Sequence, residues 1–69
     1  MMNIYADGGD KVIYTAEGGY DHDKEQAAKH LVEGQEYTVN YTTVHNWSST
    51  VVLKEVPGQK FNTVMFEDV

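Results

Sequence analysis

Hydrophobic and polar residues alternate in the second half of the chain, and this pattern predicts a β-sheet. Tyr37, Val39 and Tyr41 are separated by polar residues, and a period of two is typical of a strand with one buried face. After Thr42 the pattern shifts by one position, which predicts a β-bulge that bends the strand. The stretch Glu36–Glu67 therefore predicts three consecutive strands, of which this is the first.

Two predicted turns separate this strand from the next two. His45–Ser49 is polar apart from Trp47 and predicts the first hairpin connection. Thr50–Val56 predicts the second strand, whose Val-Val-Leu run is apolar on both faces, as expected for a central strand. Val56–Gln59 predicts a type II turn, because Pro fixes φ at its second position and Gly accepts a positive φ at its third. Phe61–Phe66 predicts the third strand.

The first half of the chain also carries a strand signal. Lys11–Ala16 predicts a strand with Val12 and Tyr14 on one face. Before it, the cluster Asp7–Asp10 predicts a turn. The first ten residues form either a short edge strand or a frayed end, and both interpretations are open.

Asp21–Gly34 carries the helical pattern. Asp23, with Gln26 three residues later, fits an N-terminal capping box. Ala27 and Leu31 form a narrow apolar face, and a helix this short must dock that face on the sheet to be stable. The final Gly stands where a C-terminal residue of positive φ is expected.

These elements predict a mainly β fold, a small SH3-like antiparallel barrel with one short helix between the first strands. An α+β sheet with one helix packed across it is the alternative. The 69 residues predict a single domain, 1–69, near the lower size limit for a stable core. Because the chain has no Cys, no disulfide can stabilise that core, and self-association into a homo-oligomer is expected.

The net charge of the chain limits the kinds of partner that we expect it to bind. The net charge is −6, with eleven acidic residues, five Lys and no Arg. Double-stranded nucleic acid is bound through Lys and Arg contacts to phosphate, so such a role is not expected. An acidic surface instead suits a basic protein partner, or serves solubility alone. No apolar run reaches the roughly 20 residues of a membrane span, and Met1–Ile4 does not resemble a secretory leader. A cytoplasmic location is expected.

Local structure explains each candidate chemical motif. Asp21–Glu25 offers oxygen ligands but lacks the Gly and Glu positions of a calcium loop. The spacings of His22, His30 and His45 match no metal-binding pattern. Ser48–Ser49 lies in the same predicted turn as His45, where the hydroxyls can cap their own backbone. We therefore expect no catalytic residue, no metal and no cofactor, and predict that the protein is not an enzyme.

Aromatic residues supply the candidate binding site. Five Tyr and one Trp exceed what so small a core can bury, and Tyr and Trp are frequent binding hot spots. Two interpretations of Trp47 are open, because it either anchors the end of the barrel or belongs to a binding surface. The residues expected in the core are Tyr37, Val39, Leu53, Val64 and Phe66. The candidate ligand-binding or partner-binding residues are Gly18, Gly19, Tyr20, Tyr41, His45 and Trp47.

Four segments of the chain share a recognisable pattern, namely Leu31–Val39, Val44–Ser49, Leu53–Gly58 and Phe61–Glu67. In these segments the chain resembles a group of short phage and prophage proteins. The similarity extends upstream to about Lys11, and the ending Phe-Asn-Thr-Val-Met-Phe-Glu is its most specific part. The resemblance implies a viral accessory gene, and small viral proteins of this kind are often directed against host defence.

Two functions in the host cytoplasm follow from this implication. In the first, a non-catalytic oligomeric sponge sequesters a nucleotide-derived immune signal by stacking its base on aromatic rings and holding its phosphate with loop amides. This function is preferred, because a small aromatic-lined oligomer offers pockets between its subunits. The absence of Arg and the acidic pair Asp21 and Asp23 count against it. In the second, an acidic protein covers and inhibits a basic surface of a host defence enzyme or nuclease, which the net charge favours. A structural module without an inhibitory role is a third option.

Overall fold

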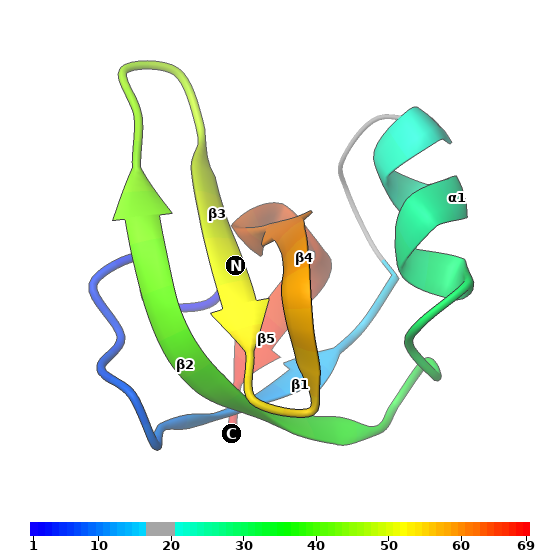
Figure 1. The fold of residues 1–69 in the computed structure, drawn as a ribbon, viewed down its shortest axis with the longest axis horizontal. Coiled ribbons are helices and arrows are strands. Elements are labelled where there is room, and N and C mark those ends of the chain that lie inside the picture. The colour runs from blue at the N-terminus through cyan, green and yellow to red at the C-terminus, as the bar shows by residue number, and fades with distance from the viewer. Residues whose placement is uncertain (17–20) are drawn as a thin grey trace.

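The elements of the computed structural model follow one another in a simple order. The structure describes residues 1–16 and 21–69, apart from the side chain of Asp23. The elements are β1 (Lys11–Tyr14), α1 (Asp21–Ala28), β2 (Glu36–Val44), β3 (Ser49–Leu53), β4 (Val56–Asn62), the 3₁₀ helix η1 (Thr63–Met65) and β5 (Phe66–Asp68). The strands form one antiparallel sheet in the order β4-β3-β2-β1-β5, with the long β2 at its centre (Figure 1).

The sheet curls because β2 has different partners along its length. Its first residues pair with β1, which also pairs with β5, whereas its later residues pair with β3, which also pairs with β4. Beyond β1, the N–H and the hydroxyl of Thr15 donate to the carbonyl of Met65 in η1, at 2.9 and 3.1 Å. The strands β4 and β5 are the edges and do not pair with each other. This is a mainly β, SH3-like, partly open barrel with one short helix between the first two strands, and the predicted fold class is confirmed.

The core fills the inside of the curled sheet. Tyr37, Val39, Leu53 and Phe66 are buried there as predicted, whereas Val64 is only partly buried and packs against the core from η1. Rings from different strands meet around β5, since the Tyr14 and Phe66 centroids lie 5.6 Å apart and those of Phe61 and Phe66 lie 6.2 Å apart. The other buried members are Met2, Ala6, Val12, Ala27, Leu31, Val51 and Met65.

The helix is shorter than the predicted segment, and it begins before the predicted N-terminal cap at Asp23. α1 starts at Asp21 and ends at Ala28, so residue 23 lies inside the first turn and is not the cap, while its side chain lies outside the described residues. Ala27 and Leu31 are buried against the sheet, as predicted. Gly34 has the predicted positive φ of 84°, but it lies beyond the helix, where its N–H donates to the carbonyl of Tyr14 at 2.7 Å. The predicted role of Gly34 as the helix terminus is wrong.

The strand boundaries differ from the prediction around the second hairpin. The chain reverses at Lys54–Glu55, between Leu53 and its partner Val56, and not within Val56–Gln59. From that pair to the pair of Val51 with Phe61, β3 advances by two residues while β4 advances by five. The predicted Pro-Gly turn is therefore an irregular stretch inside edge strand β4, where a missing N–H and a positive φ are tolerated. The predicted third strand divides into the end of β4, η1 and the start of β5.

The predicted bulge in β2 exists, but it lies earlier in the strand. Val39 pairs with Leu53 and Tyr41 pairs with Val52, so the extra residue is Asn40 and does not follow Thr42. The first ten residues contain turns and no strand. The last of these residues extend the pairing of β1 with β2, because the N–H of Gly9 donates to the carbonyl of Val39 at 2.8 Å.

Candidate binding site

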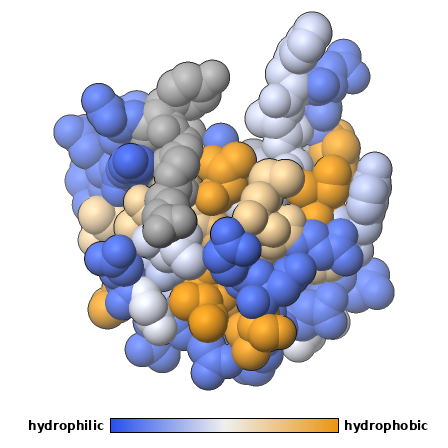
Figure 2. Space-filling model, turned by 180° about the vertical axis from the view of Figure 1, so that it is seen from behind, coloured by the Kyte–Doolittle hydropathy of each residue, from blue (hydrophilic) through white to orange (hydrophobic). Residues whose placement is uncertain are grey.

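The β2–β3 hairpin projects from the barrel on a fixed base. The base of the projecting turn is Ser49, the residue directly after it, whose hydroxyl and that of Thr63 hydrogen-bond to each other, and both residues are buried. At its tip, the N–H of His45 donates to the carbonyl of Ser48 at 2.7 Å. Seen from behind, the hairpin stands out beyond the body of the molecule and has apolar surface at its base (Figure 2). A loop held in this way loses little conformational entropy when it binds a partner.

Trp47 occupies the tip of this hairpin and is almost fully solvent-exposed. Its side chain is 98% exposed, the highest fraction among the large hydrophobic residues that the structure describes. The interpretation of Trp47 as an anchor of the barrel end is therefore wrong. A Trp in water forgoes the burial of a large apolar surface, and a fully exposed aromatic residue beside further apolar surface is typical of an interaction site.

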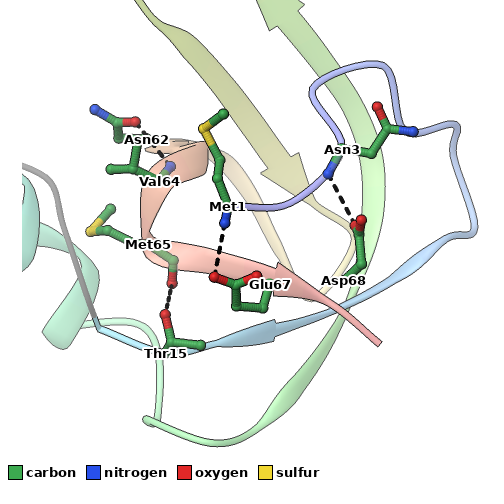
Figure 3. Close-up of polar contacts among 8 residues, drawn as sticks. All are labelled: Met1, Asn3, Thr15, Asn62, Val64, Met65, Glu67 and Asp68. Carbon is green, nitrogen blue, oxygen red and sulfur yellow. Dashed lines mark hydrogen bonds and ion pairs between the residues drawn. The ribbon is translucent and has the colours of Figure 1, made fainter.

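A groove of about 500 Å³ lies between the hairpin and the barrel. One wall comes from the hairpin and the other from η1 and the N-terminal segment, which is residues 1–10. Met1 lies beside η1, near Val64, and its amino group is ion-paired with Glu67 of β5 at 2.8 Å (Figure 3). The N–H of Asn3 donates to Asp68 at 3.0 Å, which ties the same segment to β5. The residues lining the groove are Met1, Ile4, Val44, His45, Asn46, Trp47, Ser48, Ser49, Asn62 and Val64.

The hairpin and the groove lack charged side chains. The sequence from Tyr37 to Leu53 contains no Asp, Glu or Lys, so all eleven acidic residues and all five Lys lie elsewhere in the chain. None of the described residues that line the groove is Asp, Glu or Lys. The site is thus apolar and hydrogen-bonding, with side-chain amides and hydroxyls from Asn46, Ser48 and Asn62, on an otherwise acidic molecule.

The structure brings together only some of the predicted site residues. His45 and Trp47 both line the groove. Tyr41 is 49% exposed on β2, opposite Val52, and does not line it. Gly18, Gly19 and Tyr20 lie outside the described residues. No side chains from the first ten residues were predicted in the site, although Met1 and Ile4 line the groove, because nothing in the sequence indicates that this segment folds back beside η1.

Two further observations concern other kinds of site. The described part of the chain contains no group of three or more His, Cys, Asp or Glu residues placed to hold a metal ion. Among the described residues, no helix is long and apolar enough to cross a membrane.

Comparison with protein families gives one match. Residues 3–69 match the family described as bacteriophage T4 protein Y07B. The chain belongs to this family. Its phage origin agrees with the resemblance to short phage proteins. No curated protein and no solved structure matches the chain.

Proposed function

We propose that this phage protein is a non-catalytic binding protein that inhibits a host defence protein in the host cytoplasm. In this proposal the β2–β3 hairpin inserts Trp47 into an apolar cleft of the host protein, and the groove receives a side chain of that protein in return. The observation that carries the proposal is the 98% exposure of Trp47 on a hairpin whose base is fixed and buried. An exposed indole beside an apolar groove is typical of an interaction site.

The composition of the hairpin supports a protein partner. Interface cores are enriched in aromatic residues and depleted of charged ones, and paratope loops combine Tyr and Trp with Ser and Asn. The hairpin tip His45–Ser48 combines Trp with Asn and Ser, and the charge-free stretch extends well to either side of it.

The charge distribution supports a basic partner. The net charge of −6 lies entirely outside the stretch from Tyr37 to Leu53, so an acidic molecule presents an uncharged contact surface. Such an arrangement steers a positively charged protein toward the hairpin and leaves the contact itself free of buried charges. The rate of association should therefore fall as salt concentration rises.

The sponge for a nucleotide-derived signal is the second candidate, and the size of the groove is the observation in its favour. A volume of about 500 Å³ is within the range of small-molecule sites, and Trp47 could stack on a base. However, cations bind the negative phosphates of a nucleotide more strongly than neutral amides and hydroxyls do, and the groove contains no Lys among its described lining residues. We therefore rank the protein-binding function first. Homo-oligomerisation stays a prediction under either function.

Affinity capture from a lysate of the phage's bacterial host tests the first function. The immobilised chain is compared with Trp47→Ala and with Tyr5→Ala, because Tyr5 is also a largely exposed aromatic residue but does not line the groove. We expect one basic host protein to be retained by the parent chain and by Tyr5→Ala, and to be lost with Trp47→Ala. Equal retention by all three would exclude the hairpin as the contact.

A thermal-shift panel of cyclic dinucleotides and ADP-ribose derivatives tests the second function. If the groove does not hold nucleotides, no member of the panel raises the melting temperature of the protein. A ligand present at 100 times its dissociation constant would stabilise the folded state by about 2.7 kcal/mol, which is a shift of roughly 10 °C or more in a domain of this size. Such a shift, if abolished by Trp47→Ala, would place the sponge first.

A further inference from the structure

The hydrogen bonds of β2 alternate between its two edges. The carbonyl of Thr38 accepts the N–H of Lys54 at 2.8 Å, so the backbone of Thr38 faces the β3 side. Val39 faces the opposite side, where its carbonyl accepts the N–H of Gly9 and its N–H donates to the carbonyl of Asp10, both at 2.8 Å. The N-terminal segment thus covers the outer edge of β2 as far as Val39.

Beyond the bulge at Asn40, the described residues pair with no backbone group on this outer edge. His45 is hydrogen-bonded across the hairpin to Ser48, and in an antiparallel pair hydrogen-bonded and non-hydrogen-bonded positions alternate. Counting back from His45, Thr43 faces β3, whereas Val44 and Thr42 direct their N–H and C=O groups outward. No hydrogen-bond partner for these outward groups occurs among the described residues. The edge from Tyr41 to Val44 thus presents an unpaired ladder of donors and acceptors.

The other edges of the sheet carry the features that block pairing with another chain. Edge strand β4 contains Pro57, a left-handed Gly58 and Lys60, and edge strand β5 is three residues long and includes Glu67 and Asp68. Proline, irregular backbone, charged side chains and short length all discourage strand addition. The Tyr41–Val44 edge is also short and adjoins the bulge at Asn40, but it contains no Pro and no charged residue and is rich in β-branched residues.

We propose that the Tyr41–Val44 edge of β2 binds an extended segment of the partner protein by β-strand addition. A peptide backbone supplies the matching alternation of N–H and C=O groups, which is why the occupant is a strand. Val44 also lines the groove, so a segment paired with this edge is placed to direct one of its side chains into the groove. The expected segment is uncharged and rich in β-branched or aromatic residues, with Lys or Arg at its ends to match the acidic body.

This inference rests on the proposed function only in assuming a protein partner, and it assigns the contact to the backbone of β2 rather than to Trp47. A library of random twelve-residue peptides displayed on the surface of a carrier supplies the probe. Selected peptides are synthesised, and hydrogen exchange of each backbone amide of the protein is followed by NMR with and without peptide. We expect peptides to be selected and to slow the exchange of the Thr42 and Val44 amides.

A backbone substitution then tests the hydrogen bonds directly. The chain is short enough for chemical synthesis, so the Thr42 N–H can be replaced by an ester oxygen without changing any side chain. We expect the affinity for the selected peptide to fall about three- to tenfold, the value of one hydrogen bond, while an ester at exposed Glu33, in the loop after α1, leaves it unchanged. Peptide binding that survives Trp47→Ala while depending on Thr42 would support the strand site even if the hairpin-insertion function fails.

Three outcomes would overturn the inference. They are an empty selection, selected peptides that protect amides elsewhere, and protection of Thr42 and Val44 that rises with protein concentration alone. The last outcome would mean that a second copy of the chain occupies the edge.

Discussion

Ser49 and Thr63 join the first residue of β3 to the first residue of η1 through a hydroxyl–hydroxyl hydrogen bond in the buried interior. The Thr63 hydroxyl also lies 3.4 Å from the Ser49 carbonyl, to which it donates. This pair closes the base of the hairpin against the barrel. We expect Thr63→Val, which keeps the shape of the side chain, to lower the free energy of unfolding by about 1–3 kcal/mol, because the Ser49 hydroxyl is left buried without its partner. Urea unfolding followed by circular dichroism measures this.

A double-mutant cycle separates the hydrogen bond from packing. If the penalty in Thr63→Val comes from the unpaired hydroxyl, Ser49→Ala combined with Thr63→Val loses less stability than the sum of the two single variants. Additive losses would mean that the two hydroxyls do not act as a pair.

Gly8 is required by the bulge in β2. A Cβ added to Gly8 would lie 2.8 Å from the carbonyl oxygen of Asn40, a backbone atom that cannot rotate away. We expect Gly8→Ala to lower the free energy of unfolding by about 1–3 kcal/mol through overpacking, or roughly 5–20 °C in melting temperature for a domain of this size. The neighbouring Asp7→Ala, at an exposed position, is the control and should change the melting temperature little. A Gly8→Ala protein as stable as the parent would show that the bulge is not tightly packed there.

The stability of the protein depends on pH through the carboxyl group of Glu55. Burial by itself raises the pKa of Glu55. Two other effects lower it and outweigh burial, namely hydrogen bonds from Thr38 and the nearby charge of Lys11. The N–H of Thr38 donates to the two carboxylate oxygens at 2.8 and 3.1 Å. The pKa therefore lies below its ordinary value of 4.5. A lowered pKa means that the ionised carboxylate stabilises the folded state above pH 4.5, and that this contribution is lost as the pH falls through the folded-state pKa.

The variant Glu55→Gln should remove this part of the acid sensitivity. We expect it to be less stable than the parent at pH 6 by under about 1 kcal/mol, because Glu55 is exposed and solvent screens its interactions. The difference should shrink toward zero at pH 3. Thermal melts of both proteins across pH 3–6 measure it, with Glu25→Gln as the control for removing one negative charge. A difference that does not change with pH would contradict the role of the carboxylate.

The sequence predicts the parts of the fold that depend on local periodicity. The alternation in the first half of β2 correctly places Tyr37 and Val39 in the core, and the alternation in β1 correctly puts Val12 and Tyr14 on one face, which is buried, because a strand with one buried face must alternate. The docking of α1 was predictable from Ala27 for the same kind of reason.

The parts that it does not predict depend on contacts between distant segments. The Pro-Gly pair is the strongest local turn signal, yet the chain reverses three residues earlier than Pro57, at Lys54, because pairing of Leu53 with Val56 allows the irregular stretch to sit on an open sheet edge. The exposure of Trp47 likewise depends on how far the hairpin extends beyond the barrel, which no local pattern encodes. The N-terminal wall of the groove was not predicted either, because it forms through contacts between segments that are far apart in the sequence.

The most direct test of the account is the affinity of the captured host protein for the parent chain and for Trp47→Ala, measured by isothermal titration calorimetry. Because Trp47 is exposed, the variant should melt within about 2 °C of the parent. Its dissociation constant should nevertheless rise about thirtyfold or more, as expected for a hot-spot residue. An unchanged dissociation constant with an intact fold would contradict the claim that the hairpin is the binding element.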